Sequence, residues 1–323
     1  MKHPRRRFLD LAAGAAALPT LARFAWAQTY PSRPVRLIIG YPPGSGPDII
    51  ARLIGQGLSE RLGQLFVVEN RPGASGNIGT EIVVKAPPDG YTLLMVVAAN
   101  TVNTTFYTNL NFNFIRDIAP VASIAGTSYG MLVNQSFPVK TAPEFIAYAK
   151  TNPGKINMAS AGSGSGPHVV GELFKMMTGI DLVHVPYRSS YWPDLLSGQV
   201  QVAFAPMPSS TGYIQAGTLR ALAMTGATRS EALPNIPTVG EFVPGYEAIG
   251  WYGLGAPRDT PAAIIDKLNN EINGVLADPI IKARLFALGA EPMPMTSAAF
   301  GKFMSDETDK WGKVIKFAGI KPD

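Results

Sequence analysis

Apolar and polar positions in the first third of the chain switch between the periods of strands and helices. Val35–Ile39 is a β-branched run that stops at Gly40. After a loop rich in proline and glycine, one apolar residue recurs every four positions, namely Ile50, Ile54, Leu58 and Leu62. That spacing predicts an amphipathic helix. Apolar runs at 65–68 and 91–97, around a helix at 77–86, complete a βαβαβ order, which predicts a parallel sheet with right-handed crossovers.

The same alternation restarts in the middle of the chain. Short apolar runs predict strands at 130–133, 155–158, 182–185, 200–204 and 219–223. Helices are expected between them, at 141–150, 166–178 and around Asp194. A further strand at 250–255 precedes three helices, the first with Thr260 as N-cap and Pro261 behind it, the others at 279–288 and 297–317.

Two such units predict an α/β protein with two lobes. The C-terminal helices need a sheet to cover, and the simplest assembly returns them to the first unit. The chain would then cross between the lobes twice, near 122–133 and 245–256. We therefore expect residues 28–125 together with 250–323 to form lobe 1, and residues 126–249 to form lobe 2.

The first 27 residues have the pattern of an export signal. A basic stretch from Pro4 to Asp10 is followed by a run of apolar and small residues from Leu11 to Ala22. Ala25-Trp-Ala27 then has the small-x-small form that signal peptidase cleaves. Arg5-Arg6 resembles a twin-arginine motif, and ordinary secretory export is the alternative. A membrane anchor is disfavoured because the uncharged run is shorter than the ~20 residues that span a bilayer. We expect a mature protein in the periplasm.

Composition narrows the function further. The 323 residues are 46% hydrophobic and 16% charged and include no Cys, so the chain is expected to fold and to lack disulfides, thiolate zinc sites and iron–sulfur clusters. The pI near 9.3 suggests nucleic-acid binding. However, residues 1–27 hold five of the 28 basic side chains and one of the 23 acidic ones. The mature chain would therefore have 23 basic and 22 acidic side chains. We therefore predict no nucleic-acid partner.

Two loops rich in small residues each join a strand to a helix. They are Tyr41-Pro-Pro-Gly-Ser-Gly-Pro-Asp48, in which Asp48 is expected to be the helix N-cap, and Ala159-Ser-Ala-Gly-Ser-Gly-Ser-Gly-Pro-His168. Backbone amides and a helix start in such a place favour an anion site, one half in each lobe, and a plain tight turn is the alternative. Neither loop fits a phosphate-binding or a dinucleotide-binding pattern.

The candidate side chains offer little catalysis. No serine lies in a Gly-x-Ser-x-Gly elbow, and no carboxylate pair or His/Asp/Glu cluster has metal-ligand spacing, so we predict no catalytic residue, metal or cofactor. His168 is a candidate ligand contact, whereas His184 is expected in the core or at an edge. Arg188 is a bidentate partner for a carboxylate or a structural salt bridge. Trp251 and Tyr252 are interpreted as packing residues.

Several motifs resemble the Bug family, the extracytoplasmic solute receptors of tripartite tricarboxylate transporters. They are Tyr30-Pro-Ser-Arg-Pro-Val-Arg, Tyr41-Pro-Pro-Gly-x-x-x-Asp48, Val68-Glu-Asn-Arg-Pro-Gly-Ala-Ser-Gly-Asn-Ile-Gly79, Pro87-Pro-Asp-Gly-Tyr91-Thr, Val185-Pro-Tyr-Arg188, Asp194-Leu-Leu-Ser-Gly-Gln-Val200 and Gly250-Trp-Tyr-Gly-Leu254. The resemblance covers the whole mature chain in order. It implies a periplasmic-binding-protein fold, type II-like, with the ligand cleft between two α/β lobes.

The resemblance also implies the function. A di- or tricarboxylate or a related small organic acid would be held largely by main-chain amides and ordered water, and the receptor, a monomer, would pass it to two integral membrane subunits. The candidate ligand-binding residues are Tyr41, Gly44, Ser45, Gly46, Asp48, Asn77, Asn100, Ser160, Ala161, Gly162, Gly164, Ser165, His168, Tyr187, Arg188 and Ser189. A sensory receptor of the same fold and a secreted serine hydrolase are the alternatives.

Three departures from the family pattern bear on specificity. Ser45 and Ser189 stand where glycine is frequent, and Ala205-Pro206 stands where an aspartate is frequent. Tyr191 and Trp192 are expected to make the far end of the pocket apolar. These changes favour a longer or aromatic carboxylate over citrate.

Overall fold

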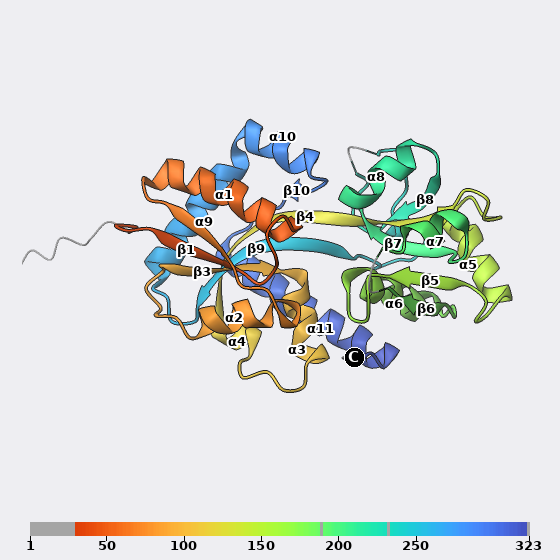
Figure 1. Ribbon diagram of the computed structural model, residues 1–323, viewed down its shortest axis with the longest axis horizontal. Coiled ribbons are helices and arrows are strands. Elements are labelled where there is room, and N and C mark those ends of the chain that lie inside the picture. Colours follow the sequence, from red (N-terminus) through yellow and green to blue (C-terminus); the bar gives the residue numbers. More distant parts are fainter. Residues whose placement is uncertain (1–29, 188–189, 231–232, 322–323) are drawn as a thin grey trace, which may run out of the picture.

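The computed structural model describes residues 30–187, 190–230 and 233–321. Figure 1 shows two α/β lobes side by side, joined by two long strands, β4 (Ile118–Asn134) and β9 (Ile249–Pro257). Residues 1–27, for which an export signal is predicted, lie outside the described part of the chain, as do the candidate ligand-binding residues Arg188 and Ser189. The expected two-lobed α/β architecture is confirmed.

Lobe 1 is built on a parallel sheet in the order β2-β1-β3, to which β9 adds an antiparallel strand. Its strands are β1 (Val35–Ile39), β2 (Phe66–Asn70) and β3 (Thr92–Val97). Its helices are α1 (Gly46–Leu62), α2 (Asn77–Val84), α3 (Ala98–Phe106), α4 (Phe114–Asp117), α9 (Ala262–Ala277) and α10 (Pro279–Ala287). Helices α1 and α9 pack on one face of the sheet, as the apolar stripe of α1 predicts, and bury Ile50, Ile54 and Leu58.

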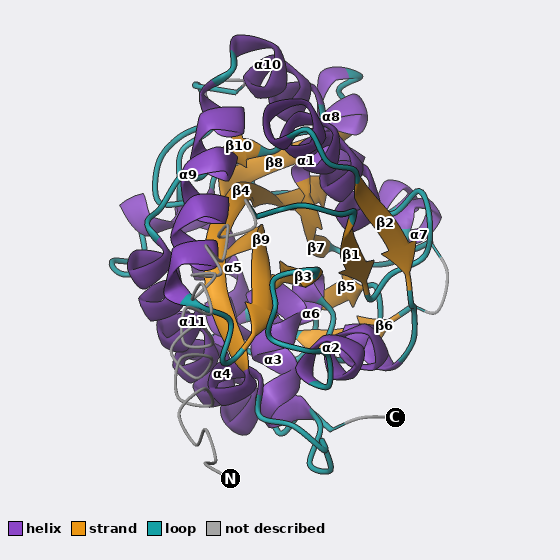
Figure 2. Ribbon diagram, turned by 90° about the vertical axis from the view of Figure 1, so that its left-hand side faces the viewer, coloured by secondary structure: helices purple, strands orange, loops and turns teal. Residues whose placement is uncertain are grey.

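Lobe 2 contains the parallel strands β6-β5-β7 beside the antiparallel strands β4 and β8. The new strands are β5 (Asn157–Ser160), β6 (Val183–Pro186), β7 (Val202–Pro206) and β8 (Leu219–Met224). The helices are α5 (Ala142–Thr151), α6 (Gly166–Thr178), α7 (Trp192–Ser197) and α8 (Met207–Gln215). Two clusters of buried side chains, one on each face of the sheet, form its core. Helices surround the strands of both lobes, as Figure 2 shows. The predicted strands and helices of this lobe are present, most of them with shifts of one or two residues at their ends. The exceptions are the strand expected at 130–133, which is the end of the much longer β4, and helix α8, which was not expected.

Strand β4 belongs to both lobes. Its residues 118–128 pair with β9 in lobe 1, where the short strand β10 (Glu291–Pro292) lies on its other edge. Its residues 129–134 pair with β7 and β8 in lobe 2. One continuous backbone therefore runs through the junction, and its two edges carry the lobes.

The last helix, α11 (Ser297–Ala318), also contacts both lobes. Its first half packs Phe300 and Met304 against the lobe 1 sheet, whereas Trp311 near its end lies in the lobe 2 core. Glu307 is buried between these halves and accepts hydrogen bonds from the indole nitrogens of Trp251 at 3.3 Å and Trp311 at 2.9 Å. The lobe boundaries at 125/126 and 249/250 stay a prediction, since α11 packs against both lobes.

Two further local differences from the expectations concern helices of lobe 1. Helix α3 was not expected, although it follows β3 directly, because Ala98-Ala-Asn-Thr101 carries no marked apolar period. Helix α9 begins at Ala262 with Pro261 as N-cap, one residue later than predicted. Thr260 does not cap it because its hydroxyl donates to the carbonyl of Pro257 at 2.7 Å and closes a turn instead.

The β4–β9 pairing depends on Gly253, which lies opposite Ser123. A Cβ there would be 2.3 Å from Cζ of Phe300 and 2.8 Å from the carbonyl oxygen of Ala122. Because a strand carbonyl cannot move aside, we expect Gly253→Ala to lower the free energy of unfolding by about 3 kcal/mol. Gly212→Ala, where no atom lies within 4 Å, is the control. Urea unfolding measures both, and equal stability of the two variants would contradict the prediction.

Candidate functional site

A cavity of about 190 Å³ lies between the lobes. It is bordered by the first loop and α3 from lobe 1, by the second loop and α6 from lobe 2, and by the crossing strands β4 and β9. Most of its wall is apolar. The lining residues are Tyr41, Pro47, Val97, Ala98, Ala99, Val102, Thr127, Tyr129, Gly164, Gly166, Val169, Val170, Pro206, Ile249, Gly250, Trp251, Tyr252 and Trp311.

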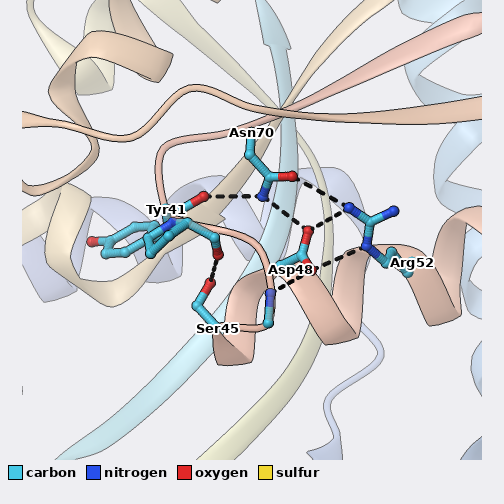
Figure 3. A network of polar contacts seen from close by, with 7 residues as sticks. Tyr41, Ser45, Asp48, Arg52 and Asn70 are labelled. Atoms are coloured by element: carbon cyan, nitrogen blue, oxygen red, sulfur yellow. Dashed lines mark hydrogen bonds and ion pairs between the residues drawn. The ribbon is translucent and has the colours of Figure 1, made fainter.

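The first loop is fixed by the buried carboxylate of Asp48, as Figure 3 shows. Asp48 accepts hydrogen bonds from the amide of Gly44 at 2.9 Å, from Arg52 at 2.9 and 3.0 Å, and from Nδ2 of Asn70 at 2.9 Å. Nδ2 of Asn70 also donates to the carbonyl of Tyr41 at 3.0 Å. The Arg52 hydrogen bonds, with smaller contributions from Gly44 and Asn70, lower the pKa of Asp48 to about 2. The carboxylate thus holds both ends of the loop.

The expectation that Asp48 is the N-cap of α1 is wrong. The helix begins at Gly46, with Ser45 in an extended conformation as N-cap. Pro47 fits inside the first turn because proline has no amide hydrogen to lose there. The hydroxyl of Ser45 donates to the carbonyl of Pro42 at 2.7 Å, so it turns back into the loop.

The second loop is fixed by an imidazole in place of a carboxylate. The amide of Gly164 donates to Nδ1 of His168 at 3.1 Å, and Nε2 of His168 lies 3.6 Å from Glu172. The ring of His184 stacks on His168 with 3.5 Å between centroids, and Nε2 of His184 is 2.6 Å from Oγ of Ser160. His184 is therefore partly buried at the loop, where it supports His168.

The two loops end in a repeated sequence. Gly44-Ser-Gly-Pro-Asp48 in lobe 1 matches Gly164-Ser-Gly-Pro-His168 in lobe 2. Both initial glycines have positive φ, +79° and +73°, which glycine tolerates best. In each loop the fifth side chain accepts the amide of the first glycine. The sequence motif therefore builds the same structure twice, once on each side of the cavity.

Each repeat leaves amide donors at a helix start. Among the described residues, the amides of Gly46, Asp48, Gly166 and His168 have no hydrogen-bond acceptor. Pro47 of α1 and Gly166 of α6 both line the cavity. Unpaired first-turn amides and the helix dipole make these two places favourable for negative charge.

Two predicted site residues carry buried polar atoms without a partner in the described part of the chain. They are Nδ2 of Asn77 at the start of α2 and Oγ of Ser165, the N-cap of α6. Oδ1 of Asn77 is held by Asn103 at 3.0 Å. Buried polar atoms are normally paired, so these atoms are available to a ligand or to water.

Other predicted residues use their polar groups internally. The side chain of Asn100 accepts from the amide of Val97 at 2.8 Å and donates to Thr80 at 3.0 Å. Ser160 is fully buried against His184, and the hydroxyl of Tyr187 donates to Asp194 at 2.5 Å. The side chains of Asn100, Ser160 and Tyr187 therefore support the loops rather than offering free donors to the cavity.

Gly162 and Ala161 form the turn between Ser160 and Gly164. Gly162 has φ of +108°, and its amide donates back to Oγ of Ser160 at 3.2 Å. Among the candidates of the second loop, only Gly164 lines the cavity, while Tyr41 does so from the first loop. The hydroxyl of Tyr41 donates to the carbonyl of Ser75 at 3.2 Å.

The apolar wall comes from residues other than those expected. Tyr191 and Trp192 do not line the cavity, since they pack with Tyr213 of α8 in a separate aromatic cluster of lobe 2. Pro206 does border the cavity, and it belongs to the Ala205-Pro206 pair that stands where the family pattern favours an aspartate. Residues of α3, β4, β9 and α11 supply the rest, and sequence reasoning missed them. One sequence feature could have placed α3 at the site. Ala98-Ala99 follows the apolar strand at 91–97, and the segments that follow parallel strands lie at the same edge of the sheet as the first loop.

Within the described residues, no group of His, Asp or Glu is arranged to hold a metal ion. The same residues contain no helix with the length and hydrophobicity needed to cross a membrane.

Two α/β lobes around a cleft, with crossing strands and opposed helix starts, define a solute-binding protein. Residues 50–320 match the family described as "Tripartite tricarboxylate transporter family receptor", and the chain belongs to this family. The Bug-type resemblance of the sequence is thereby confirmed.

Three similar proteins extend the match over nearly the whole chain. Protein BugT of Bordetella pertussis is 34% identical over 91% of this chain and 92% of its own length. An R. palustris protein solved with adipate is 36% identical, with a TM-score of 0.77, and the match covers 91% of this chain and all of that one. The periplasmic binding protein BugD is 31% identical, with a TM-score of 0.72 over the same shares.

The Asp48 network predicts a pH-dependent stability. Because the folded pKa of Asp48 is lowered, its contribution is present above its ordinary pKa and is lost as the pH falls toward about 2. Arg52 is half exposed, so we expect Asp48→Asn to cost only about 1–2 kcal/mol at neutral pH and almost nothing near pH 2. Chemical unfolding across this pH range measures the difference. Asp306→Asn, in an exposed pair with Lys302, is the control, and a cost independent of pH would disprove the interpretation.

Proposed function

We propose that this protein is an extracytoplasmic receptor that captures a small organic carboxylate and delivers it to a tripartite tricarboxylate-type transporter. The observation that carries the proposal is the pair of matched loops, each of which presents unpaired helix-start amides beside one cavity. Amides in such a place suit a carboxylate, since charge-assisted hydrogen bonds are strong where water is excluded. The family membership and the adipate found with the R. palustris relative support this class of ligand.

The cavity wall bears on the size and polarity of the ligand. Val97, Val102, Trp251 and Trp311 present apolar surface between the two loops. An acid with an aliphatic or aromatic body buries more apolar area there than a compact, fully polar acid such as citrate. We therefore propose a di- or tricarboxylate or related acid at the less polar end of the range.

Location and partners follow from the same proposal. Residues 1–27 would direct export, by the twin-arginine or the secretory route, and cleavage near Ala27 would release a monomer into the periplasm. BugD, a relative, is a periplasmic binding protein. The loaded receptor would then meet two integral membrane subunits. In the alternative, a sensory receptor of the same fold, the closed, ligand-bound form would contact a signalling partner instead of a transporter.

The serine hydrolase alternative has one point in its favour. Oγ of Ser160 is 2.6 Å from Nε2 of His184, a distance that suits a nucleophile and its base. Ser160 is fully buried, however, and does not line the cavity. We therefore propose a receptor without catalytic activity.

A thermal-shift screen of the mature chain against organic acids tests the ligand class. An acid that binds only the folded state adds about 2.7 kcal/mol to the free energy of unfolding when its concentration is a hundred times Kd. The melting temperature rises accordingly. We expect linear and aromatic carboxylates to raise it, and the corresponding amides, which keep the shape without the charge, to have no effect. Equal shifts with acids and amides would rule out an anion site.

Closure of the lobes is a separate prediction. A ligand that touches residues 28–125 or 250–323 on one side and 126–249 on the other stabilises the closed form. We expect the radius of gyration from small-angle X-ray scattering to fall when the tightest acid of the screen is added. An unchanged radius at saturating ligand would contradict hinge closure.

A further inference from the structure

Two tyrosines that the sequence analysis did not place in the site face the cavity from the crossing strands. Tyr252 of β9 pairs with Ala125 on the lobe 1 side of the junction, and Tyr129 of β4 pairs with Pro206 on the lobe 2 side. Both line the cavity. One tyrosine therefore stands next to each lobe, on the strands that join the lobes.

Each hydroxyl lies against the first residue of a loop-borne helix. A Cβ at Gly46, the first residue of α1, would be 2.9 Å from Oη of Tyr252. A Cβ at Gly166, the first residue of α6, would be 2.3 Å from Oη of Tyr129. Glycine at both positions thus leaves room for a phenol oxygen at the helix start, and the repeat includes this contact as well.

Neither hydroxyl has a hydrogen-bond partner among the described residues, although Tyr129 is only 8% exposed. The hydroxyl of Tyr41, in the same cavity, is occupied by the Ser75 carbonyl. Burial raises the pKa of Tyr129 and of Tyr252, and for Tyr129 the nearby Tyr252 adds to the effect. Both phenols therefore remain protonated donors at neutral pH, and each can donate to a ligand acceptor that enters the cavity.

We propose that Tyr129 and Tyr252 are specificity-determining residues of two matched half-sites, each made of a helix start and one phenol donor. The inference rests on the proposed carboxylate function and deepens it. A ligand with a carboxylate at each end of an apolar chain would satisfy both phenols and both sets of amides, one end in each lobe. An acid with one carboxylate would leave one half-site unpaired, which costs affinity.

The experiment is calorimetric titration of the mature chain with linear dicarboxylates from succinate to azelate and with monocarboxylates from butyrate to nonanoate. The variants are Tyr129→Phe and Tyr252→Phe. Tyr148→Phe is the matched control, because Tyr148 packs on Phe137 away from the cavity. We expect each site variant to weaken the tightest dicarboxylate about ten-fold or more, since a hydrogen bond to a charged group is lost. The control should bind as the wild type does.

The monocarboxylates distinguish ligand contact from a structural effect. We expect only one of the two site substitutions to lower the affinity for a given monocarboxylate. General damage to the fold would instead make both variants bind every ligand more weakly. Wild-type affinity for dicarboxylates in both variants, or equal wild-type affinity for mono- and dicarboxylates of one length, would overturn this inference and leave the carboxylate receptor standing. Failure of every acid to bind the wild type would remove the proposed function, and this inference with it.

Discussion

The antiparallel pairing of β4 with β9 is the constraint on which the rest of the structure depends. Two strands of 17 and nine residues carry the connection between the lobes and also form one wall of the cavity. Glycines on β9 keep that pairing close, and at Gly253 the space for a side chain is already filled by Phe300. Since the same strands bear Tyr129, Trp251 and Tyr252, a motion of one lobe against the other moves groups that line the site. The proposed closure would thus be coupled to recognition through shared backbone rather than through a long chain of contacts.

The two repeated loops are held in the same conformation by different side chains, a carboxylate in lobe 1 and an imidazole in lobe 2. A strand-to-helix turn that offers amides to an anion must be held open without using those amides. Here the fifth side chain of each repeat takes the amide of the first glycine, which lies just outside the helix, and leaves the first-turn donors free. In lobe 1 that side chain is an ionised aspartate balanced by Arg52, and in lobe 2 it is an imidazole stacked on His184. The carboxylate therefore contacts the first loop directly, whereas beneath the second loop the nearest carboxylate, that of Glu172, lies behind the imidazole at 3.6 Å from Nε2 of His168.

Much of this could be predicted from the sequence, because strand and helix periods and the two small-residue loops are local features. The lobes, the parallel strands and the opposed loops follow from them. Properties that depend on packing could not be predicted. The sequence shows that residue 164 is a glycine, but it does not show that its φ is +73° or that an added Cβ would lie 2.9 Å from the ring of Phe106. A larger residue at this position would therefore disturb the fold, and its effect on binding could not be interpreted. Likewise Tyr252 is interpreted from the sequence as a packing residue and Tyr129 has no predicted role. Only the crossing of β4 and β9 brings their hydroxyls to the helix starts.

The buried carboxylate of Glu307 has a consequence beyond packing. By accepting hydrogen bonds from Trp251 and Trp311 it joins an indole of the crossing strand to one of the final helix, and both rings border the cavity. Two of the chain's four tryptophans are thus held by one acceptor at the place where solute would replace water. Indole emission shifts with the polarity around the ring, so the receptor contains its own optical probe. Its signal arises from the site itself, with the orientation of both rings fixed by the same carboxylate.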